Sequence, residues 1–294
     1  MEIFGISTQA LFGQLLIGLG NGSFYALLSL GLAVIFGLLN IINFTHGAQY
    51  MMGAFVAYIL LNRFGIGYWW SLAIAPVVVG ATGVLIERTM LARLYKLDHL
   101  YGLLLTFGLA LIIQGLFRNE FGSAGLPYQI PAQLTGAQNL GFMFMPNYRA
   151  WVVVASLVVC LSTWYVIERT KLGSYLRAAT ENPQLVQAFG INVPRMITLT
   201  YGFGVGLAGL AGVMAAPIYQ VSPQMGADLI IVVFAVVVIG GMGSIMGSIV
   251  TGFGLGLIEG LTKVFYPEAS NTVIFIIMAI VLLVKPAGLF GTQK

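Results

Sequence analysis

Charged residues are scarce in this sequence. Asp, Glu, Lys and Arg make up 7% of its 294 residues, whereas a typical soluble domain has about 25%. Hydrophobic residues make up 59%, and the mean hydropathy is +0.96. So few charges cannot cover a water-facing surface, and several runs exceed the ~18 apolar residues that mark a membrane span. The composition excludes a soluble protein and predicts an all-α polytopic transmembrane helical bundle, a single transmembrane domain over 1–294.

Cysteine and histidine are nearly absent. The one cysteine, Cys160, lies in an apolar run and excludes an internal disulfide. The two histidines, His46 and His99, lack metal-site spacing, so neither a metal nor another cofactor is expected. No Walker-type loop and no Ser-His-Asp pattern is found. The sequence therefore argues against an enzyme and against ATP binding by this chain itself.

Acidic residues number nine, and most lie in loops or at the ends of apolar runs. Only Asp228 and Glu259 are candidates for membrane depth. A proton-coupled carrier normally needs a buried relay of ionisable groups, and these two make a poor one. Secondary active transport loses support on this ground. An ATP-independent channel or secondary carrier for a small polar solute is nevertheless kept as the alternative function.

Apolar runs predict eight or nine membrane crossings. One run, 226–264, is too long for a single span, and the sequence GGMGSIMG at 240–247 breaks it. The N-terminus lacks a basic segment and a cleavage site, so the first run is expected to target the chain to the membrane. The runs cover approximately 9–38, 47–62, 68–86, 100–117, 150–167, 196–218, 226–264 and 271–285.

Basic residues predict the orientation. The net charge of +4 is attributed to cytoplasmic loops and not to nucleic-acid binding. Three Lys or Arg residues lie in 87–99 and four in 168–195, together seven of 13. The connection between them, 118–149, then faces outside. Contact with an external partner and a merely solvated loop are both compatible with its Gly-, Pro- and Asn-rich composition.

Glycines recur at four-residue spacing in two of the apolar runs. Small residues at this spacing let membrane helices approach closely, so a tightly packed bundle is expected. The residues are Gly202 and Gly206, and Gly252, Gly256 and Gly260. Two glycine-broken segments, 33–55 and 235–256, also resemble each other. Transporters are often built from such repeats, although coincidence within an apolar alphabet explains the likeness equally well.

Polar side chains interrupt the chain between the first two apolar runs, at NIINFTHGAQYMMGAF (40–55). Irregular backbone at membrane depth is tolerated only where it is buried in protein or lines a cavity. The polar groups therefore either satisfy freed backbone groups or line a solute path, and His46 could also respond to pH. Asn40 belongs to the same break. The path candidates are Asn21, Ser23, Asn43, Thr45, His46 and Gln49.

The basic segment 168–195 is predicted to contain a short amphipathic helix. Asn182 can cap it, with Pro183 in the first helical position, and Gly190 can end it. Its apolar face consists of Leu185, Val186 and Phe189. Such a helix fits a groove on a cytoplasmic partner. Lying flat on membrane lipid is the alternative.

Three stretches resemble the permease subunits of the branched-chain amino acid family of bacterial ABC importers. GLGNGSFYALLSLGLAVIFGLLNIINFTHGAQYMMGAF (18–55) resembles the N-terminal signature. RAATENPQLVQAFGINVPR (177–195) resembles the cytoplasmic loop, and KPAGLFG (285–291) resembles the C-terminal end. Together they span nearly the whole chain in the right order.

The resemblance implies a multi-pass permease of the bacterial inner membrane that forms half of an ATP-driven translocation pathway. Its implied partners are a second, related permease subunit, two cytoplasmic ATPase subunits and an external substrate-binding protein. The implied substrates are branched-chain amino acids. The residues implied to couple to an ATPase are Glu181, Asn182, Leu185, Val186, Phe189, Gly190 and Ile191.

The resemblance has one departure. Many family members carry a glutamate after the histidine-glycine pair, and this chain has Ala48 and then Gln49. A carboxylate that could meet a substrate ammonium is therefore missing. Related small solutes, namely amides, urea-like molecules and organic acids including aromatic ones, stay open as substrates.

Overall fold

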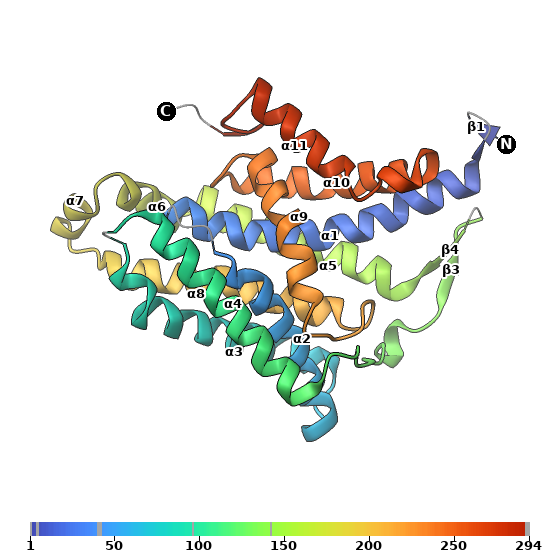
Figure 1. The fold of residues 1–294 in the computed structure, drawn as a ribbon, viewed down its shortest axis with the longest axis horizontal. Helices are drawn as coiled ribbons and strands as arrows, with labels where there is room; N and C mark the ends of the chain where they lie inside the picture. The colour runs from blue at the N-terminus through green and yellow to red at the C-terminus, as the bar shows by residue number, and fades with distance from the viewer. Residues whose placement is uncertain (1, 4–5, 40–42, 96, 142, 292–294) are drawn as a thin grey trace.

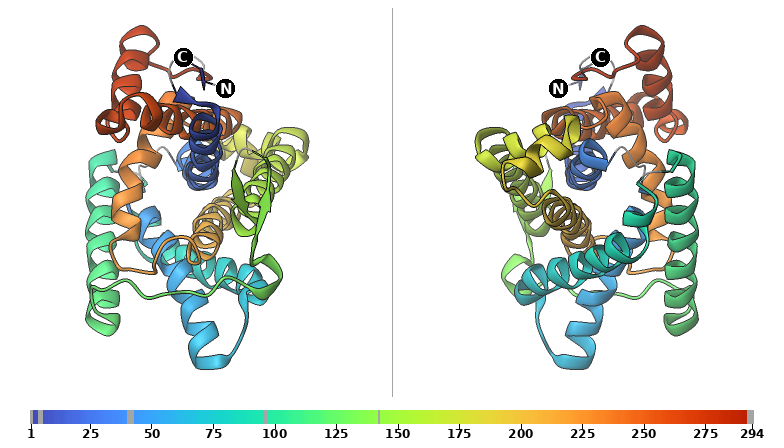
Figure 2. Two further views of the ribbon diagram at one scale, coloured as in Figure 1. Left: turned by 90° about the vertical axis from the view of Figure 1, so that its right-hand side faces the viewer. Right: turned by 90° about the vertical axis from the view of Figure 1, so that its left-hand side faces the viewer.

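The computed structural model describes residues 2–3, 6–39, 43–95, 97–141 and 143–291. They form a helical bundle in which α1 (Thr8–Leu39) and α10 (Ile245–Phe265) run along the long axis, while α4 (His99–Phe121) is inclined to it (Figure 1). Two short helices, α6 and α7, lie at one end of this axis, and a β3–β4 hairpin lies near the other. Helices α1 and α8 run through the middle, with α4 and α5 on opposite flanks (Figure 2). The all-α membrane-bundle class predicted from composition is confirmed.

Each predicted apolar run corresponds to a helix, and the run 226–264 divides into two. The apolar helices are α1 (Thr8–Leu39), α2 (Thr45–Phe64), α3 (Tyr68–Thr89), α4 (His99–Phe121), α5 (Asn147–Arg169), α8 (Val193–Ala215), α9 (Met225–Gly240), α10 (Ile245–Phe265) and α11 (Val273–Val284). The smaller elements are α6 (Lys171–Glu181), α7 (Pro183–Ala188), three 3-10 turns (Leu91–Arg93, Ala132–Leu134, Pro267–Ala269) and the antiparallel hairpins β1 (Glu2–Ile3) with β2 (Ile6–Ser7) and β3 (Ala137–Asn139) with β4 (Phe144–Pro146).

Six of these helices are long and apolar enough to cross a membrane: α1, α3, α4, α5, α8 and α10. Helices α9 and α11 are apolar but shorter, with 16 and 12 residues. Large hydrophobic side chains cover the outer face, as Val77 on α3 and Leu283 on α11 illustrate. Because lipid is the only solvent that accepts such a surface, the chain is a multi-pass membrane protein.

The two polar connections lie at opposite ends of the bundle, as the charge distribution predicts (Figure 1). The connection predicted at 118–149 is shorter than expected, because α4 extends to Phe121 and α5 begins at Asn147. It is also anchored to the bundle. Leu126 pairs with Val221 through two backbone hydrogen bonds of 2.9 Å, and Tyr128 is buried. The connection is therefore anchored at Leu126 and Tyr128, while most of its other described residues are exposed.

Glycines bring the helix backbones together, as their spacing predicts. A Cβ added at Gly80 on α3 would lie 2.9 Å from the carbonyl oxygen of Gly202 on α8. On the other side of the bundle, Gly256 of α10 lies directly against Gly18 and Gly22 of α1. Helix α1 thus packs along α10 as α8 packs along α3.

The helices form two sets with the same order and opposite direction, α1–α4 and α8–α11, separated by α5. Helix α1 runs toward the α6–α7 end, whereas α8 starts from it (Figure 1). The sets meet reciprocally where α1 crosses α8. A Cβ at Gly31 would lie 2.6 Å from the Gly204 oxygen, and a Cβ at Gly204 would lie 2.8 Å from the Gly31 oxygen. These relations describe an inverted repeat.

The likeness between 33–55 and 235–256, for which coincidence was the alternative, does not correspond to the structural repeat. The structural counterpart of α1–α2 is α8–α9, and not the segment 235–256. The glycine break in 235–256 is a tight turn between α9 and α10, with φ of 104° at Gly241 and 84° at Gly243. The break after α1 instead leads into a new helix inside the bundle. The glycine pattern that the two segments share therefore occurs at two different kinds of connection, a tight turn and the start of a new helix.

Candidate translocation site

Helix α2 begins inside the bundle, at the polar break. Asn40 lies outside the described residues. Thr45 Oγ1 donates a 2.9 Å hydrogen bond to the carbonyl oxygen of Thr106 on α4, and the backbone N–H of Phe44 donates to Thr106 Oγ1 at 3.3 Å. The Phe44 bond satisfies a backbone N–H that a helix start leaves without an intrahelical partner. Thr45 therefore secures the start of α2 to α4.

His46 ties α2 to α1. Its side chain is fully buried, and Nε2 lies 3.0 Å from the carbonyl oxygen of Leu28. Since a carbonyl oxygen only accepts, Nε2 carries the proton and donates. The ring also lies where a side chain at Gly31 would be, 3.0 Å from an added Cβ. His46 thus occupies the crossing of the two repeats as a structural link.

Asn43 and Gln49 form a second buried polar group. Asn43 Nδ2 is 3.5 Å from Gln49 Oε1, and Tyr201 of α8 lies close to both. Asn43 Oδ1, Gln49 Nε2 and Tyr201 Oη are buried, and none of them makes a hydrogen bond of good geometry with a residue that the structure describes. Buried polar groups of this kind are uncommon and tend to occur at functional positions.

A pocket of about 230 Å³ lies beside the break, between α2, α4 and α9. The residues that the break contributes to the pocket wall are spaced i, i+3, i+4 and i+7. They therefore share one face of a helix, and this face is apolar. The predicted path residues Asn43, Thr45, His46 and Gln49 do not line it. The residues lining it from the break are Phe44, Gly47, Ala48 and Met51, and among those opposite are Phe107, Gln114 and Ile230.

Two helices begin at this pocket. Gly47 in the first turn of α2 and Gly226 in the first turn of α9 pack backbone to backbone, and a Cβ on either would collide with the carbonyl oxygen of the other. They hold corresponding places in the two repeats. Helix N-termini carry partial positive charge, so the two starts direct that charge to one place. Broken transporter helices present substrate groups with such ends.

The other two predicted path residues lie elsewhere. Ser23 donates to the carbonyl oxygen of Leu19 within α1 at 3.0 Å. Asn21 Nδ2 is 3.4 Å from Glu259 Oε1, and Asn21 Oδ1 accepts from Tyr219 Oη at 3.0 Å. Neither lines the pocket. The structure therefore does not bring Asn21 and Ser23 together with the break at Asn43–Gln49.

Two buried carboxylates occupy equivalent places in the repeats. Glu259 on α10 accepts a 2.7 Å bond from Tyr25 of α1 and forms an ion pair with Lys263. Glu87 on α3 accepts bonds from Thr198 of α8 at 2.7 Å and from Tyr95 at 2.6 Å. Each glutamate lies seven residues after a glycine at which two helices are in contact. Glu259 follows Gly252, and Glu87 follows Gly80.

Sequence reasoning had placed Asp228 rather than Glu87 at membrane depth. Asp228 is exposed, and Glu87 is buried. Burial, followed by the hydrogen bond to Glu87, raises the pKa of Tyr95 well above its usual range, so its phenol keeps the proton that it donates. The shared seven-residue spacing from a glycine was the sequence signal that could have identified Glu87.

The short helix in the α6–α7 segment forms as predicted. Asn182 Oδ1 accepts from the backbone N–H of Leu185 at 2.9 Å, and Gly190 follows the helix with a φ of 82°. Leu185 and Phe189 are 54% and 78% exposed. Val186 is only 6% exposed and packs on Leu176 and Met196.

The predicted apolar face of α7 was therefore wrong in one residue. Val186 faces inward, because positions i and i+4, Leu185 and Phe189, share one side of a helix and i+1 turns away from it. Glu181 is exposed at the end of α6, and Ile191 is half-buried against the Val186 cluster. Helix α6 itself was not predicted.

A family model described as "Branched-chain amino acid transport system / permease component" matches residues 14–282. This chain belongs to that permease family. The match covers both repeats, the pocket and the α6–α7 segment. No solved structure matches the chain. Among the described residues, no group of three or more His, Cys, Asp or Glu could hold a metal ion.

Relatives align with nearly the whole length of this chain. The high-affinity branched-chain amino acid transport system permease protein LivH of Escherichia coli (strain K12) is 30% identical, with 96% of each chain covered. The permease protein BraD of Pseudomonas aeruginosa is likewise 30% identical over 96% of each chain. LivM of Escherichia coli (strain K12) is 29% identical over 92% of this chain and 68% of its own length. The family thus contains two kinds of permease from one named transport system.

Proposed function

We propose that this chain is one of two permease subunits of an ATP-driven importer, and that its solute passes the pocket where α2 and α9 begin. The observation that carries the proposal is the reciprocal packing of Gly47 and Gly226. It places two helix starts, one from each repeat, beside a pocket. Substrate sites of repeat-built transporters lie at such repeat interfaces.

Branched-chain amino acids are the proposed substrates, as the names of the relatives support. The pocket wall is almost wholly apolar, with Phe44, Met51 and Ile230 available to an aliphatic side chain. The two helix starts favour the substrate carboxylate. Ala48, which takes the place of a glutamate found in many family members, lines this pocket and keeps it uncharged.

Leu185 and Phe189 of α7 are proposed to dock on a cytoplasmic ATPase. Both are large, apolar and exposed at the polar end of the bundle, which is the pattern of a helix that fits a groove. Closure of the ATPases would then push α7, and the bundle would switch between outward- and inward-facing states that bind the solute differently.

The first test is recovery of the tagged chain from its native membranes in mild detergent, with copurifying proteins identified by mass spectrometry. An ATPase with a Walker motif and a second permease are expected. The same complex, reconstituted with its binding protein, should take up leucine only with ATP. Competition by amides, urea-like solutes and aromatic acids then defines the substrate class.

The alternative function gives the opposite result in the same material. A channel or secondary carrier would be recovered alone from membranes in which other complexes stay intact. It would also move solute in liposomes that contain this chain only and no ATP. Either outcome would overturn the importer proposal.

A further inference from the structure

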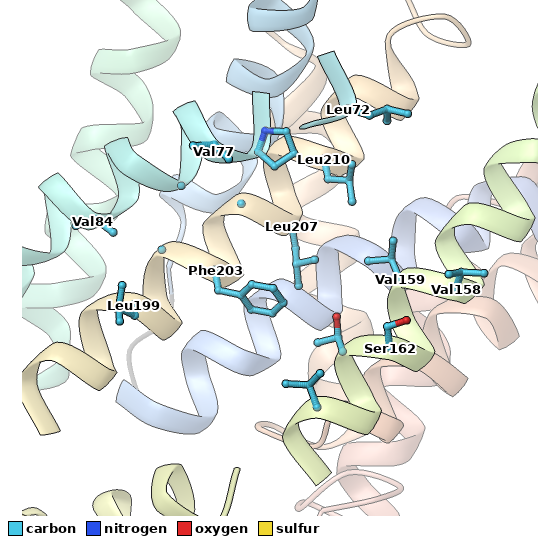
Figure 3. Close-up of a pocket in the computed structure, with 16 residues that line it drawn as sticks. Leu72, Val77, Val84, Val158, Val159, Ser162, Leu199, Phe203, Leu207 and Leu210 are labelled. Atoms are coloured by element: carbon cyan, nitrogen blue, oxygen red, sulfur yellow. The ribbon is translucent and has the colours of Figure 1, made fainter. Parts of the chain in front are cut away.

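A separate cavity lies away from the pocket between α2, α4 and α9, on the flank formed by α3, α5 and α8. Its volume is about 710 Å³. Figure 3 shows Phe203 and Leu207 of α8 directed into the space between α3 and α5, with Val158 and Ser162 on the α5 side. Ser162 and Thr163 are the only hydroxyl side chains in its lining. The proposed solute path makes no use of this groove.

A second cavity continues the groove toward the α6–α7 end. It has a volume of about 490 Å³ and shares Val166, Leu199 and Phe203 with the first. Its far end is lined by Leu176 of α6 and by Ile191. Together the cavities form one apolar groove that runs along the bundle to the α6–α7 segment.

Exposed basic residues occupy the ends of the lining helices that lie toward α6 and α7. They are Arg88 at the end of α3, Arg169 at the end of α5, Lys171 at the start of α6 and Arg195 at the start of α8. All four are exposed, and none forms an ion pair with a residue that the structure describes. Arg177, the other basic residue of α6, is paired with Glu168. The positive-inside rule assigns this end to the cytoplasmic leaflet, whose surface carries anionic lipid.

We infer that this groove binds an anionic phospholipid of the cytoplasmic leaflet, with an acyl chain along α3, α5 and α8 and the phosphate near Lys171 and Arg195. An apolar groove that ends in unpaired cations matches an amphiphile with one apolar and one anionic part. Basic sites between membrane helices bind lipid headgroups by this chemistry. A helix of another subunit fits less well. A 20 Å length of helix about 10 Å across occupies roughly 1,600 Å³, whereas the two cavities have volumes of about 710 and 490 Å³.

The lipid would contact the element proposed to receive the ATPase. Leu172, Leu176 and Ile191 line the groove, and Leu176 and Ile191 belong to the cluster that holds Val186 of α7. An acyl chain there fills space that would otherwise separate α6 from α8. Bound lipid therefore stabilises the α6–α7 segment in its observed position.

Native mass spectrometry of the purified complex, delipidated and titrated with phosphatidylglycerol or phosphatidylcholine, tests the inference. Phosphatidylglycerol should bind more tightly than phosphatidylcholine. The double substitution Lys171→Gln/Arg195→Gln should lower its affinity roughly 30-fold, since each basic group near an anionic surface contributes about a fivefold factor. Arg118→Gln/Arg149→Gln, which removes two basic groups at the opposite end, should leave the affinity unchanged.

A second pair of variants tests the apolar part. Val158 lines the groove and is 58% exposed, whereas Val154, one turn away on α5, is 57% exposed and does not line it. Val158→Trp should fill the groove and weaken phosphatidylglycerol binding, and Val154→Trp should not. Equal binding of the two lipids, or equal effects of the paired variants, would overturn the inference. So would an efficient cross-link from Val158→Cys to the second permease, which would identify a protein as the occupant.

Discussion

Gly47 of α2 and Gly226 of α9 each occupy the space that a side chain of the other would need. The two residues are 179 positions apart in sequence, yet each lies in the first turn of a helix that begins inside the bundle. Their contact joins the two inverted repeats at the wall of the pocket between α2, α4 and α9. Substitutions here should therefore affect both folding and transport.

Gly47→Ala and Gly226→Ala should each destabilise the protein by about 1–3 kcal/mol, because an added methyl group must displace a backbone carbonyl in a packed site. Thermal unfolding in detergent measures the effect. Gly108→Ala on α4 is the matched control, since no atom lies within 4 Å of its added Cβ. It should be neutral or stabilising by about 0.5–1 kcal/mol. Similar melting temperatures for all three variants would contradict the contact.

A larger side chain in the pocket should impair transport without unfolding the chain. Ala227 on α9 lines the pocket and is exposed, so Ala227→Leu adds bulk without displacing the core. Apparent leucine affinity in the reconstituted complex should fall about tenfold, because overpacking a site costs roughly 1–3 kcal/mol. Ala81→Leu, at an exposed position on α3 outside every cavity described here, should transport normally. Unchanged uptake by Ala227→Leu would move the path elsewhere.

The α7 helix allows docking to be separated from folding. Phe189→Ala should leave the melting temperature unchanged and lower recovery of the ATPase in pull-downs, because Phe189 is exposed. Val186→Ala should lower the melting temperature, because Val186 is buried. Truncating a buried Leu, Ile or Met to Ala typically costs about 2–5 kcal/mol, and the smaller valine should cost less. If Phe189→Ala retains the ATPase fully, α7 is not its docking element.

The buried Glu259 carboxylate should be coupled to Lys263. Glu259→Gln removes the ion pair and leaves the ammonium without its partner. Lys263 is partly exposed, so the expected loss is about 1–3 kcal/mol, below that of a fully buried pair. The double variant Glu259→Gln/Lys263→Met should recover part of this loss in thermal unfolding. Additive losses in the double variant would show that the two side chains act independently.

Much of the fold could be predicted from composition and periodicity alone. Lipid-facing helices must satisfy their own backbone groups, so long apolar runs leave few alternatives to transmembrane helices. Local signals were also sufficient for the α7 helix, because the Asn182 cap and the Gly190 stop depend on neighbouring residues only. The glycine spacing likewise predicted close helix packing, although not which helices pair.

The candidate site depended on tertiary contacts. The sequence marked the polar break, but Thr45, His46 and Gln49 face other helices, while their apolar neighbours line the pocket. Which face of α2 meets a cavity depends on where α4 and α9 lie, and no local pattern encodes that. Glu87 shares the seven-residue spacing from a glycine with Glu259, but its burial depends on Thr198 from a distant helix.

The sequence by itself determined that the chain lies in a membrane, approximately where its long apolar helices lie, and which permease family it resembles. Only the tertiary structure decided that Gly47 meets Gly226, that Glu87 and Glu259 are equivalent, and that Val186 turns inward. The physical reason is the distance along the sequence over which each interaction acts. Hydrophobic length and capping act over a few residues, whereas backbone contact and burial are properties of helices brought together across the whole chain.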